Sequence, residues 1–320
     1  MEVISGHISE KAKKLHVYGI HAGYGIYRMD GSESFEDAYS KAKVAREHAL
    51  TQPELHYAFY DEIDYDTIVE NKNLENGFEK ALADKKFEVW YQPKFNSHTG
   101  KIVGSEALIR WRADDGSLIS PGRFIPLFEK NGNIIRLDEY VFREVCRQQK
   151  ECQKEGIQIL PVSVNISRFS LYYSNVVEKY ERIINYYDVD HKYVQIEITE
   201  SAAVDNDEIK SIADKFHGNG FPLLVDDFGS GYSSLVTLNM KCFDTLKIDK
   251  SLIDYIGDSN GERLLVHTIA LAKELGICVT AEGVESQEQV EFLKNIDCDS
   301  IQGFYYSKPL PLTEYEMLLD

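Results

Sequence analysis

Strand-like segments, several alternating between apolar and polar residues, and helix-like segments with apolar positions at helical spacing follow one another from about residue 85 to the C-terminus. Helices are predicted between the strands and include residues 138–154, 174–187, 207–216, 261–275 and 286–295. The predicted strands are FEVWYQP, IVGSEALIRW, LPVSVNIS, VQIEITES, PLLVDDFG, TLKID, CVTAEGV and SIQGFYYS. Eight strands with intervening helices favour an α/β fold, a (β/α)₈ barrel of the TIM type, with an open doubly wound sheet as the alternative.

Several of these strands have a polar face, although parallel strands covered by helices usually read as continuous apolar runs. In the second strand, Ala107, Ile109 and Trp111 share one face, and the opposite face carries Glu106, Leu108 and Arg110. The same alternation sets the polar residues Ser163, Asn165, Gln195, Glu197 and Lys247 opposite apolar neighbours, and Asp226 and Glu282 end two further strands. The apolar face suits a helix layer, so the polar face is predicted to point into the barrel.

Carboxylates gathered inside a barrel are costly to bury if they are ionised and unpaired. The obvious internal partners are Arg110 and Lys247, which are too few for Glu106, Glu197, Asp226, Asp227 and Glu282. Carboxylates with an amide oxygen from Asn165, without His or Cys, are hard ligands that suit Mg²⁺ or Mn²⁺. A solvent-exposed strand end explains any one of these acids, but five at one barrel face favour a metal site.

The segment before the barrel has its own pattern of helix, strand, helix and strand from about Ile8 to Asp61. Residues 16–27 and 56–60 are predicted strands, and Ser34 is a predicted helix cap with Asp37 three residues on. Leu74, Phe78 and Leu82 recur at helical spacing. We therefore expect a small α+β unit over residues 1–65, a connecting helix over 66–84 and the barrel over 85–320.

Composition limits the classes of protein that the chain can belong to. With 43% hydrophobic and 12% aromatic residues in 320, the chain can build a full core. A net charge of −18 disfavours binding to nucleic-acid polymers or anionic membranes. Five cysteines without a C-x-x-C spacing argue against a disulfide framework or a zinc site and suit a reducing cytoplasm. No apolar run is long enough to span a bilayer, and no signal peptide is evident.

From roughly Asn73 to the C-terminus the chain resembles the EAL-domain family of cyclic-di-GMP phosphodiesterases. The motifs that carry the resemblance occur in the family's order: YQPKF, SEALIRW, SVNIS, EITES, VDDFGSGYSSL, LKIDKS, AEGVES and QGFYYSKP. The resemblance implies a barrel with one antiparallel strand, a homodimer, and hydrolysis of cyclic-di-GMP to linear pGpG with two Mg²⁺ or Mn²⁺ ions per active site. Residues 1–65 resemble the C-terminal half of a GGDEF domain, although that family's glycine-rich signature turn is absent.

The resemblance also implies roles for individual residues. The first metal would be held by Glu106, Asn165, Glu197 and Asp226, and Asp226 would bridge to a second metal beside Asp227 and Glu282. Lys247 would hold the attacking water, Glu282 would help to take its proton, and Glu285 would support the site. Substrate contacts would come from Gln92, Leu108, Arg110 and Gln302. The loop after Asp226 would be supported by Glu200, Phe228, Gly229 and Ser230, where Ser230 stands in place of the family's usual Thr.

Other functions fit these motifs less well. A catalytically weak EAL domain acting as a cyclic-di-GMP-binding effector or a protein-interaction module is the main alternative, but such domains usually lack a metal ligand or the loop motif. A diguanylate cyclase would need the missing glycine-rich turn. A His-based phosphodiesterase is disfavoured because the nine histidines show no metal-ligand spacing.

Overall fold

The computed structural model describes residues 23–51, 57–62, 65–204, 207–230 and 240–319. The chain forms two compact units, Met1–Leu74 and Glu75–Asp320. The division falls within helix α3 (Tyr65–Ala83), so that the second half of this helix belongs to the larger unit.

The N-terminal unit contains a β-α-β element. Strands β1 (Tyr24–Ile26) and β2 (Tyr57–Phe59) pair in parallel, joined by α2 (Phe35–Thr51) and followed by the 3₁₀ turn η1 (Tyr60–Glu62). Ser34 caps α2 as predicted, since its Oγ accepts a hydrogen bond from the Asp37 backbone N–H at 3.2 Å. Both predicted strands are present in part, and a helix expected near Ile8 lies outside the described residues.

The larger unit is a closed barrel. Its strands are β3 (Phe87–Asn96), β4 (Ile102–Arg112), β6 (Val162–Asn165), β7 (Val194–Thr199), β8 (Leu223–Phe228), β9 (Thr245–Ile248), β10 (Cys278–Ala281) and β11 (Ser300–Ile301). They pair in this order, and β3 closes the ring by running antiparallel to both β4 and β11, while the remaining neighbours are parallel. The predicted (β/α)₈ barrel with one antiparallel strand is confirmed. Short strands β5 (Leu118–Ile119) and β12 (Leu310–Pro311) extend the sheet beside β4 and β3.

The last predicted strand, SIQGFYYS, is much shorter than expected, because β11 ends at Ile301. The chain turns there and packs its backbone against Val284. A Cβ on Gly303 would lie only 2.1 Å from the Val284 carbonyl oxygen, so glycine is needed for this approach. The Tyr305 N–H donates to the same carbonyl at 3.0 Å, which replaces the pairing that a longer strand would have made.

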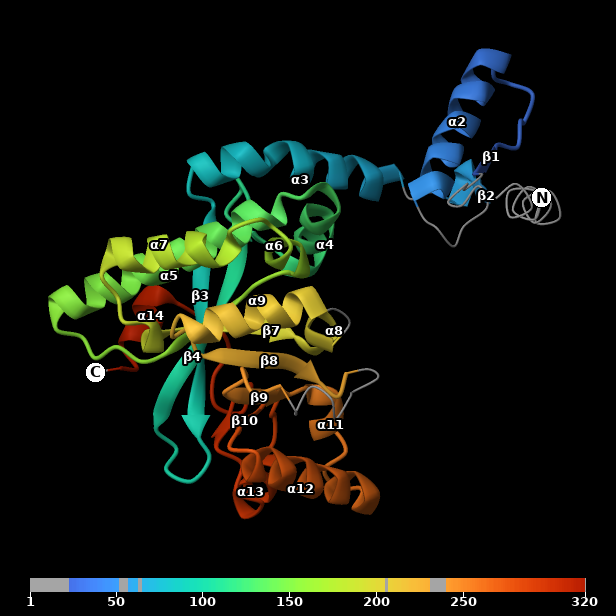
Figure 1. The fold of residues 1–320 in the computed structure, drawn as a ribbon. Helices are drawn as coiled ribbons and strands as arrows, with labels where there is room; N and C mark the ends of the chain where they lie inside the picture. Colours follow the sequence, from blue (N-terminus) through green and yellow to red (C-terminus); the bar gives the residue numbers. More distant parts are fainter. Residues whose placement is uncertain (1–22, 52–56, 63–64, 205–206, 231–239, 320) are drawn as a thin grey trace. The chain divides into compact units, whose positions relative to one another are not determined.

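Helices surround the strands (Figure 1). They are α4 (Pro121–Asn131), α5 (Ile134–Glu155), α6 (Arg168–Leu171), α7 (Val176–Tyr187), η2 (His191–Tyr193), α8 (Glu200–Val204), α9 (Asp207–Gly218), α11 (Lys250–Ile253), α12 (Ser259–Glu274), α13 (Gln287–Asn295) and α14 (Leu312–Glu316). The five predicted helices are confirmed, and α5 begins four residues earlier than expected, at Ile134. Within the ranges that the structure describes, no helix combines the length and apolar character needed to cross a bilayer.

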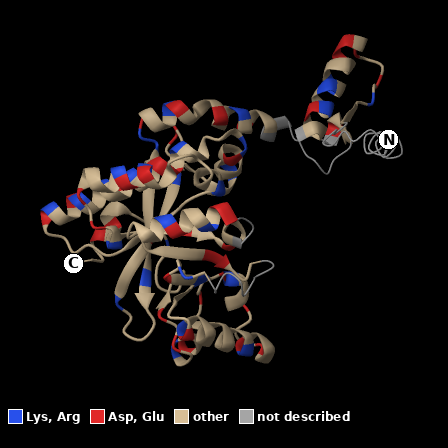
Figure 2. Cartoon of the chain, in the orientation of Figure 1, with Lys and Arg blue, Asp and Glu red and all other residues tan. Residues whose placement is uncertain are grey.

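The core lies between the strands and this helix layer. Val164, Ile196 and Val279 are fully buried and point outward from their strands, as their alternation predicts. Helix side chains such as Phe142 and Leu265 cover them. Lys, Arg, Asp and Glu are mixed along the outer helices rather than separated by sign (Figure 2). The hydrophobic free energy of the barrel therefore comes from its outer layer, which leaves its interior open to polar groups.

Phe78 of α3 tests how much the connecting helix stabilises the barrel. Its buried ring lies 4.8 Å from that of Phe128 and 5.9 Å from that of Phe87, between ring centroids. Phe78→Ala should lower the free energy of unfolding of the barrel by about 3–5 kcal/mol, because it removes a buried aromatic ring and leaves a cavity. Denaturant unfolding would measure this, with Met317→Ala, at an exposed position, as a control that should change it little. A loss below about 1 kcal/mol would contradict the assigned packing.

Candidate metal centre

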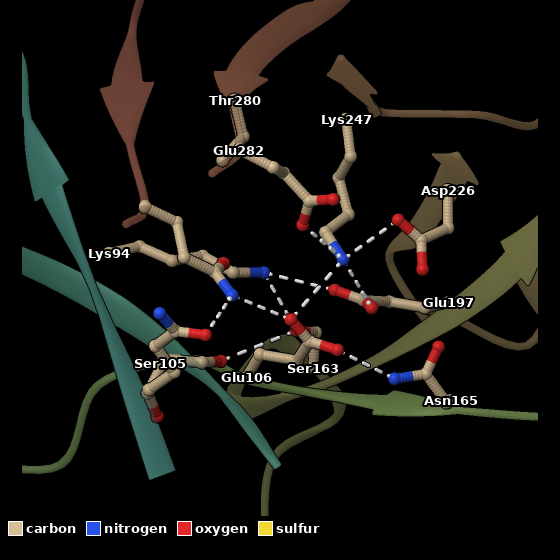
Figure 3. A network of polar contacts seen from close by, with 12 residues as sticks. Lys94, Ser105, Glu106, Ser163, Asn165, Glu197, Asp226, Lys247, Thr280 and Glu282 are labelled. Carbon is tan, nitrogen blue, oxygen red and sulfur yellow. Dashed lines mark hydrogen bonds and ion pairs between the residues drawn. The ribbon is translucent and has the colours of Figure 1, made fainter. Parts of the chain in front are cut away.

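Acidic side chains from several strands meet inside the barrel. Carboxylate oxygens of Glu106 on β4, Glu197 on β7 and Asp226 on β8 lie within 4.8 Å of one another (Figure 3). Asp226 also belongs to a second group with Asp227 and Glu282, whose carboxylate oxygens likewise lie within 4.8 Å of one another. Glu106, Glu197 and Asp226 are buried, so they are not independent strand ends in solvent. The predicted gathering of these five acids is observed, and Asp226 is shared between the two groups.

Lys247 on β9 supplies positive charge at the centre of this ring. Its Nζ lies 2.7 Å from Glu197, 2.7 Å from Glu282, 2.9 Å from Asp226 and 3.4 Å from Glu106. Burial by itself disfavours the ammonium, but the surrounding carboxylates raise the pKa of Lys247 well above its usual value. The nearby acids Asp249 and Asp244 have other partners, since Asp249 caps α11 and Asp244 accepts the Leu223 N–H.

Lys94 on β3 is a second buried lysine in the cluster. Its Nζ lies 3.0 Å from Glu197 Oε1, while Lys247 contacts Oε2 of the same carboxylate at 2.7 Å. Although burial opposes ionisation, these two ammonium groups hold the pKa of Glu197 at about 2. Glu197 is therefore an ionised carboxylate in an almost fully enclosed position, which requires strong compensating charge.

The other acids of the ring bind protons more readily than free carboxyl groups. Burial raises the pKa of Glu106, with a further contribution from the charge of Glu197. Burial likewise raises the pKa of Asp226 and Asp227, and it raises the pKa of Glu282 to about 8. The five carboxyl groups repel one another, and when ionised they carry more negative charge than Lys94 and Lys247 can offset. Binding of additional cations at this site is therefore favoured.

Amide side chains fix the outer edge of the cluster. The Asn165 Nδ2–H donates to Glu106 Oε1 at 2.7 Å (Figure 3). The Gln302 Nε2–H donates to Glu106 Oε2 at 2.6 Å. Gln302 also donates to Gln92 Oε1 at 3.1 Å. Gln92 lies opposite Glu106 in the β3–β4 register, so the closing strand brings it to the site. The structure therefore joins Gln92 and Gln302 directly to the carboxylate ring.

The start of the DDFG loop has a constrained backbone. Asp227 and Gly229 both have positive φ, 59° and 99°, and a Cβ on Gly229 would lie 2.1 Å from Leu252 Cδ1. Phe228 is buried, and the Ser230 N–H donates to the Asp227 carbonyl at 3.1 Å. The rest of the motif, residues 231–235, lies outside the described residues, so the loop support stays a prediction. Glu200 is buried at the first position of α8.

Two predicted residues lie apart from the ring. Glu285 is exposed and its Oε1 lies 3.3 Å from Lys250 Nζ. Arg110, expected to be an internal partner of the acids, instead donates to the Ile109 carbonyl and lies with its guanidinium 5.8 Å from the Trp90 ring centroid. In the described structure the ion pairs of these acids are made by Lys94 and Lys247, whereas Arg110, farther along β4, interacts with the charge of Glu106 without a described ion pair.

A hollow of about 130 Å³ adjoins the ring and is lined by Leu108, Arg110 and Asn165 together with α4 and α5 residues. Asp138 on α5 also lines it, and its Oδ2 accepts hydrogen bonds from the Ser167 N–H at 2.9 Å and the Ser170 hydroxyl at 2.7 Å. Burial raises the pKa of Asp138 to about 6. The lining of the hollow is mainly apolar, and its polar groups are Arg110, Asp138 and Asn165.

Lys94 and Asp138 are two site residues that the sequence motifs did not predict. Lys94 could have been found, since it shares a strand face with Gln92 by simple alternation and lies in the YQPKF motif. Asp138 had no such signal, because an acid near the start of a long helix is usually a solvent-exposed residue. Its burial follows from the packing of α5 against α6.

The donor set fits a divalent metal. It consists of carboxylates and an amide, which are hard oxygen ligands typical of Mg²⁺ or Mn²⁺ sites. Asn165 donates its N–H to Glu106 and so keeps its amide oxygen as a potential ligand. Asp226 belongs to both groups of acids that could hold a metal ion.

The chain belongs to the EAL-domain family, since the EAL domain model matches residues 75–309. Glu106, Ala107 and Leu108 are the three residues that spell the family's name, and they lie on β4 at the carboxylate ring. The match covers the larger unit only, and no GGDEF match accompanies it in the N-terminal unit.

Two proteins of Pseudomonas aeruginosa illustrate the relationship. The chain is 32% identical over 291 residues to the bifunctional diguanylate cyclase/cyclic di-GMP phosphodiesterase MucR, covering 90% of this chain and 42% of that protein. It is 32% identical over 299 residues to the cyclic di-GMP phosphodiesterase NbdA, covering 93% of this chain and 38% of the relative. The chain thus spans about two fifths of the length of these relatives.

Solved structures agree on the fold. The PaMucR phosphodiesterase in complex with c-di-GMP superposes with a TM-score of 0.71 at 33% identity, covering 76% of this chain and 99% of that one. The EAL domain of Mycobacterium smegmatis DcpA gives a TM-score of 0.61 at 28% identity, covering 73% and 97%. These likenesses identify the larger unit as an EAL barrel.

The buried Asp138 should make stability depend on pH. Its pKa is about 6 in the folded protein against 3.8 ordinarily, so the folded state binds the proton more tightly than the unfolded chain. Wild-type stability should therefore fall relative to Asp138→Asn as pH rises from about 4 to 7, by up to about 3 kcal/mol. Denaturant unfolding at both pH values measures this, with Asp84→Asn at an exposed position as control. A pH-independent difference would contradict the burial of an ionisable carboxyl here.

Proposed function

We propose that this chain is a metal-dependent phosphodiesterase that hydrolyses cyclic-di-GMP to linear pGpG and so lowers the level of this second messenger. The observation that carries the proposal is the ring of five acids around Lys247 inside an EAL barrel. Its relatives include a cyclic di-GMP phosphodiesterase and a phosphodiesterase solved with c-di-GMP bound, which supports the choice of substrate.

In the proposed site, Glu106, Asn165, Glu197 and Asp226 hold a first Mg²⁺ or Mn²⁺. A second ion is held by Asp226, Asp227 and Glu282, whose oxygens lie together. When bound, such ions polarise the scissile phosphate and lower the pKa of a bound water. The chain's own contribution is to gather the ligands and to hold Glu197 ionised and oriented between Lys94 and Lys247.

Lys247 is proposed to orient the attacking water, because its ammonium has donors at the centre of the ligand ring. Glu282 is proposed to help to take the proton of that water, since its carboxylate lies 2.7 Å from Lys247 Nζ. Leu108, Arg110, Gln92 and Gln302 are proposed substrate contacts, with the Arg110 fork suited to a phosphate. Glu285 is proposed to act from the rim, where it pairs with Lys250, and Glu200, Phe228, Gly229 and Ser230 to support the loop.

The N-terminal unit is proposed to be the C-terminal half of a GGDEF-like domain, on the support of its β1-α2-β2 order. Because the glycine-rich turn is absent from this chain, we expect no GTP binding by this unit. Tight GTP binding seen by calorimetry, and lost when residues 1–65 are removed, would contradict this assignment.

The direct test is to incubate the purified chain with cyclic-di-GMP and Mg²⁺ or Mn²⁺ and to separate the products by chromatography. We expect pGpG, no turnover in excess chelator, and inhibition by Ca²⁺, which is larger and holds compact geometry poorly. Glu106→Ala and Asp226→Ala should abolish turnover and leave the circular dichroism spectrum unchanged. The control Glu151→Ala, on the exposed side of α5, should retain turnover. Substrate binding without any hydrolysis would favour the effector alternative instead.

Lys247→Met separates orientation of water from binding of substrate. Methionine keeps the length of the stem and removes the donors, so kcat should fall by about 10²-fold or more while substrate affinity is retained. Rapid-quench turnover and equilibrium binding would give the two quantities separately. If affinity fell in proportion and bound substrate reacted normally, Lys247 would be a substrate anchor.

We also propose that the barrel forms a homodimer through the helices after the metal-bearing loop. Tyr255, Leu264 and Val266, which are exposed apolar residues on and before α12, support this surface. Leu264→Glu should shift the protein towards monomer in light scattering, whereas Tyr186→Glu, at an exposed position on α7, should not. A wild-type protein that is monomeric at assay concentration and fully active would rule the dimer out as a requirement.

A further inference from the structure

Lys94 is the one buried lysine of the carboxylate cluster to which the sequence motifs assigned no role. It is 5% exposed and lies on β3, the strand that runs against the direction of its neighbours. Its Nζ donates to Glu197 Oε1 at 3.0 Å and to Ser163 Oγ at 2.7 Å (Figure 3). The Ser163 hydroxyl in turn donates to the Ser105 carbonyl at 3.3 Å.

The contacts of Lys94 differ from those of Lys247. Lys247 lies within 3.4 Å of four carboxylates, whereas the described ion pair of Lys94 is with Glu197 alone. The two lysines divide the Glu197 carboxylate between them, one on each oxygen. Two donors on opposite oxygens fix the rotation of a carboxylate about its last bond, as one donor cannot.

Transferring the Lys94 ammonium from water into this buried position costs free energy, which its ion pair with Glu197 offsets only in part. Replacing a buried ion pair by apolar side chains is often neutral or stabilising, so stability alone does not explain Lys94. Its two acceptors come from β6 and β7, which β4 separates from β3 in the ring. Lys94 thus ties the antiparallel strand to the strand that carries a central acid of the ring.

We propose that Lys94 is a positioning residue that holds Oε1 of Glu197 and so presents Oε2 to the metal centre. The expected effect of Lys94 on the rate of hydrolysis rests on the proposed function, whereas its expected effect on metal affinity does not. Removal of Lys94 would release the carboxylate to rotate, and loss of such an outer contact typically weakens metal binding by about 10–100-fold. The removal of one positive charge acts in the opposite direction, and we expect the loss of orientation to be larger.

The test uses Lys94→Met, which keeps the stem and removes the donors, in the full chain. Electron paramagnetic resonance of free Mn²⁺ gives the metal affinity without substrate. We expect about a tenfold or greater loss of Mn²⁺ affinity, a lower kcat at saturating Mn²⁺, and a KM for cyclic-di-GMP that changes little. Lys86→Met, which removes a surface lysine paired with Asp114 just before β3, is the matched control and should bind Mn²⁺ as the wild type does.

A double-mutant cycle decides whether Lys94 acts through Glu197. If it does, Lys94→Met should have no further effect on Mn²⁺ affinity in a Glu197→Gln background. Lys94→Gln, which is shorter but retains a donor, should recover part of the loss and serves as the second variant if Lys94→Met folds poorly by circular dichroism. Equal losses in both backgrounds would show that Lys94 does not act through Glu197.

Mn²⁺ affinity in Lys94→Met that equals or exceeds the wild-type value would overturn the positioning role. These outcomes are separate from those of the proposed function. If the wild-type chain hydrolyses no cyclic-di-GMP but Lys94→Met weakens Mn²⁺ binding, the proposed function is wrong and the positioning role of Lys94 stands. If the wild-type chain is active but Lys94→Met leaves Mn²⁺ affinity unchanged, the proposed function stands and the positioning role is wrong.

Discussion

Mutual repulsion among buried carboxylates is the constraint on which the rest of this barrel depends. Five acids lie at one interior site, three of them almost fully enclosed, and the cluster contains two ammonium groups in the described structure. Such a collection holds together only if the fold is stabilised elsewhere and if cations offset the remaining charge. The apolar outer faces of the strands, covered by helices, provide that stability.

The antiparallel strand β3 has a particular place in this arrangement. It closes the ring between β4 and β11, and its inward face carries Gln92 and Lys94 to the acids. Gln92 reaches Glu106 through Gln302, and Lys94 reaches Glu197 directly. One strand therefore contributes both an amide and a charge to residues that lie on distant parts of the chain.

Electrostatics and backbone geometry act together at the loop side of the ring. Asp227 and Gly229 take up positive φ directly after Asp226, and the close approach to Leu252 requires glycine. This turn sets Asp227 beside Asp226 and Glu282 although consecutive strand residues point to opposite faces. The group formed by Asp226, Asp227 and Glu282 exists because the positive φ of Asp227 interrupts the regular alternation at the end of β8.

The sequence by itself determined the order of the strands and helices and the identity of the acids, because alternation along a strand fixes which side chains share a face. It favoured a barrel over an open doubly wound sheet, and the tertiary structure decided between them through the closure of the ring by β3. It could not determine that Lys94 rather than Arg110 would neutralise those acids, since this depends on how far along the barrel axis each side chain lies. It also gave no sign that Asp138 would be buried or that β11 would be two residues long. Those outcomes depend on contacts between segments far apart in the chain, namely α5 with α6 and the backbone of Gly303 with Val284, which only the tertiary structure brings together.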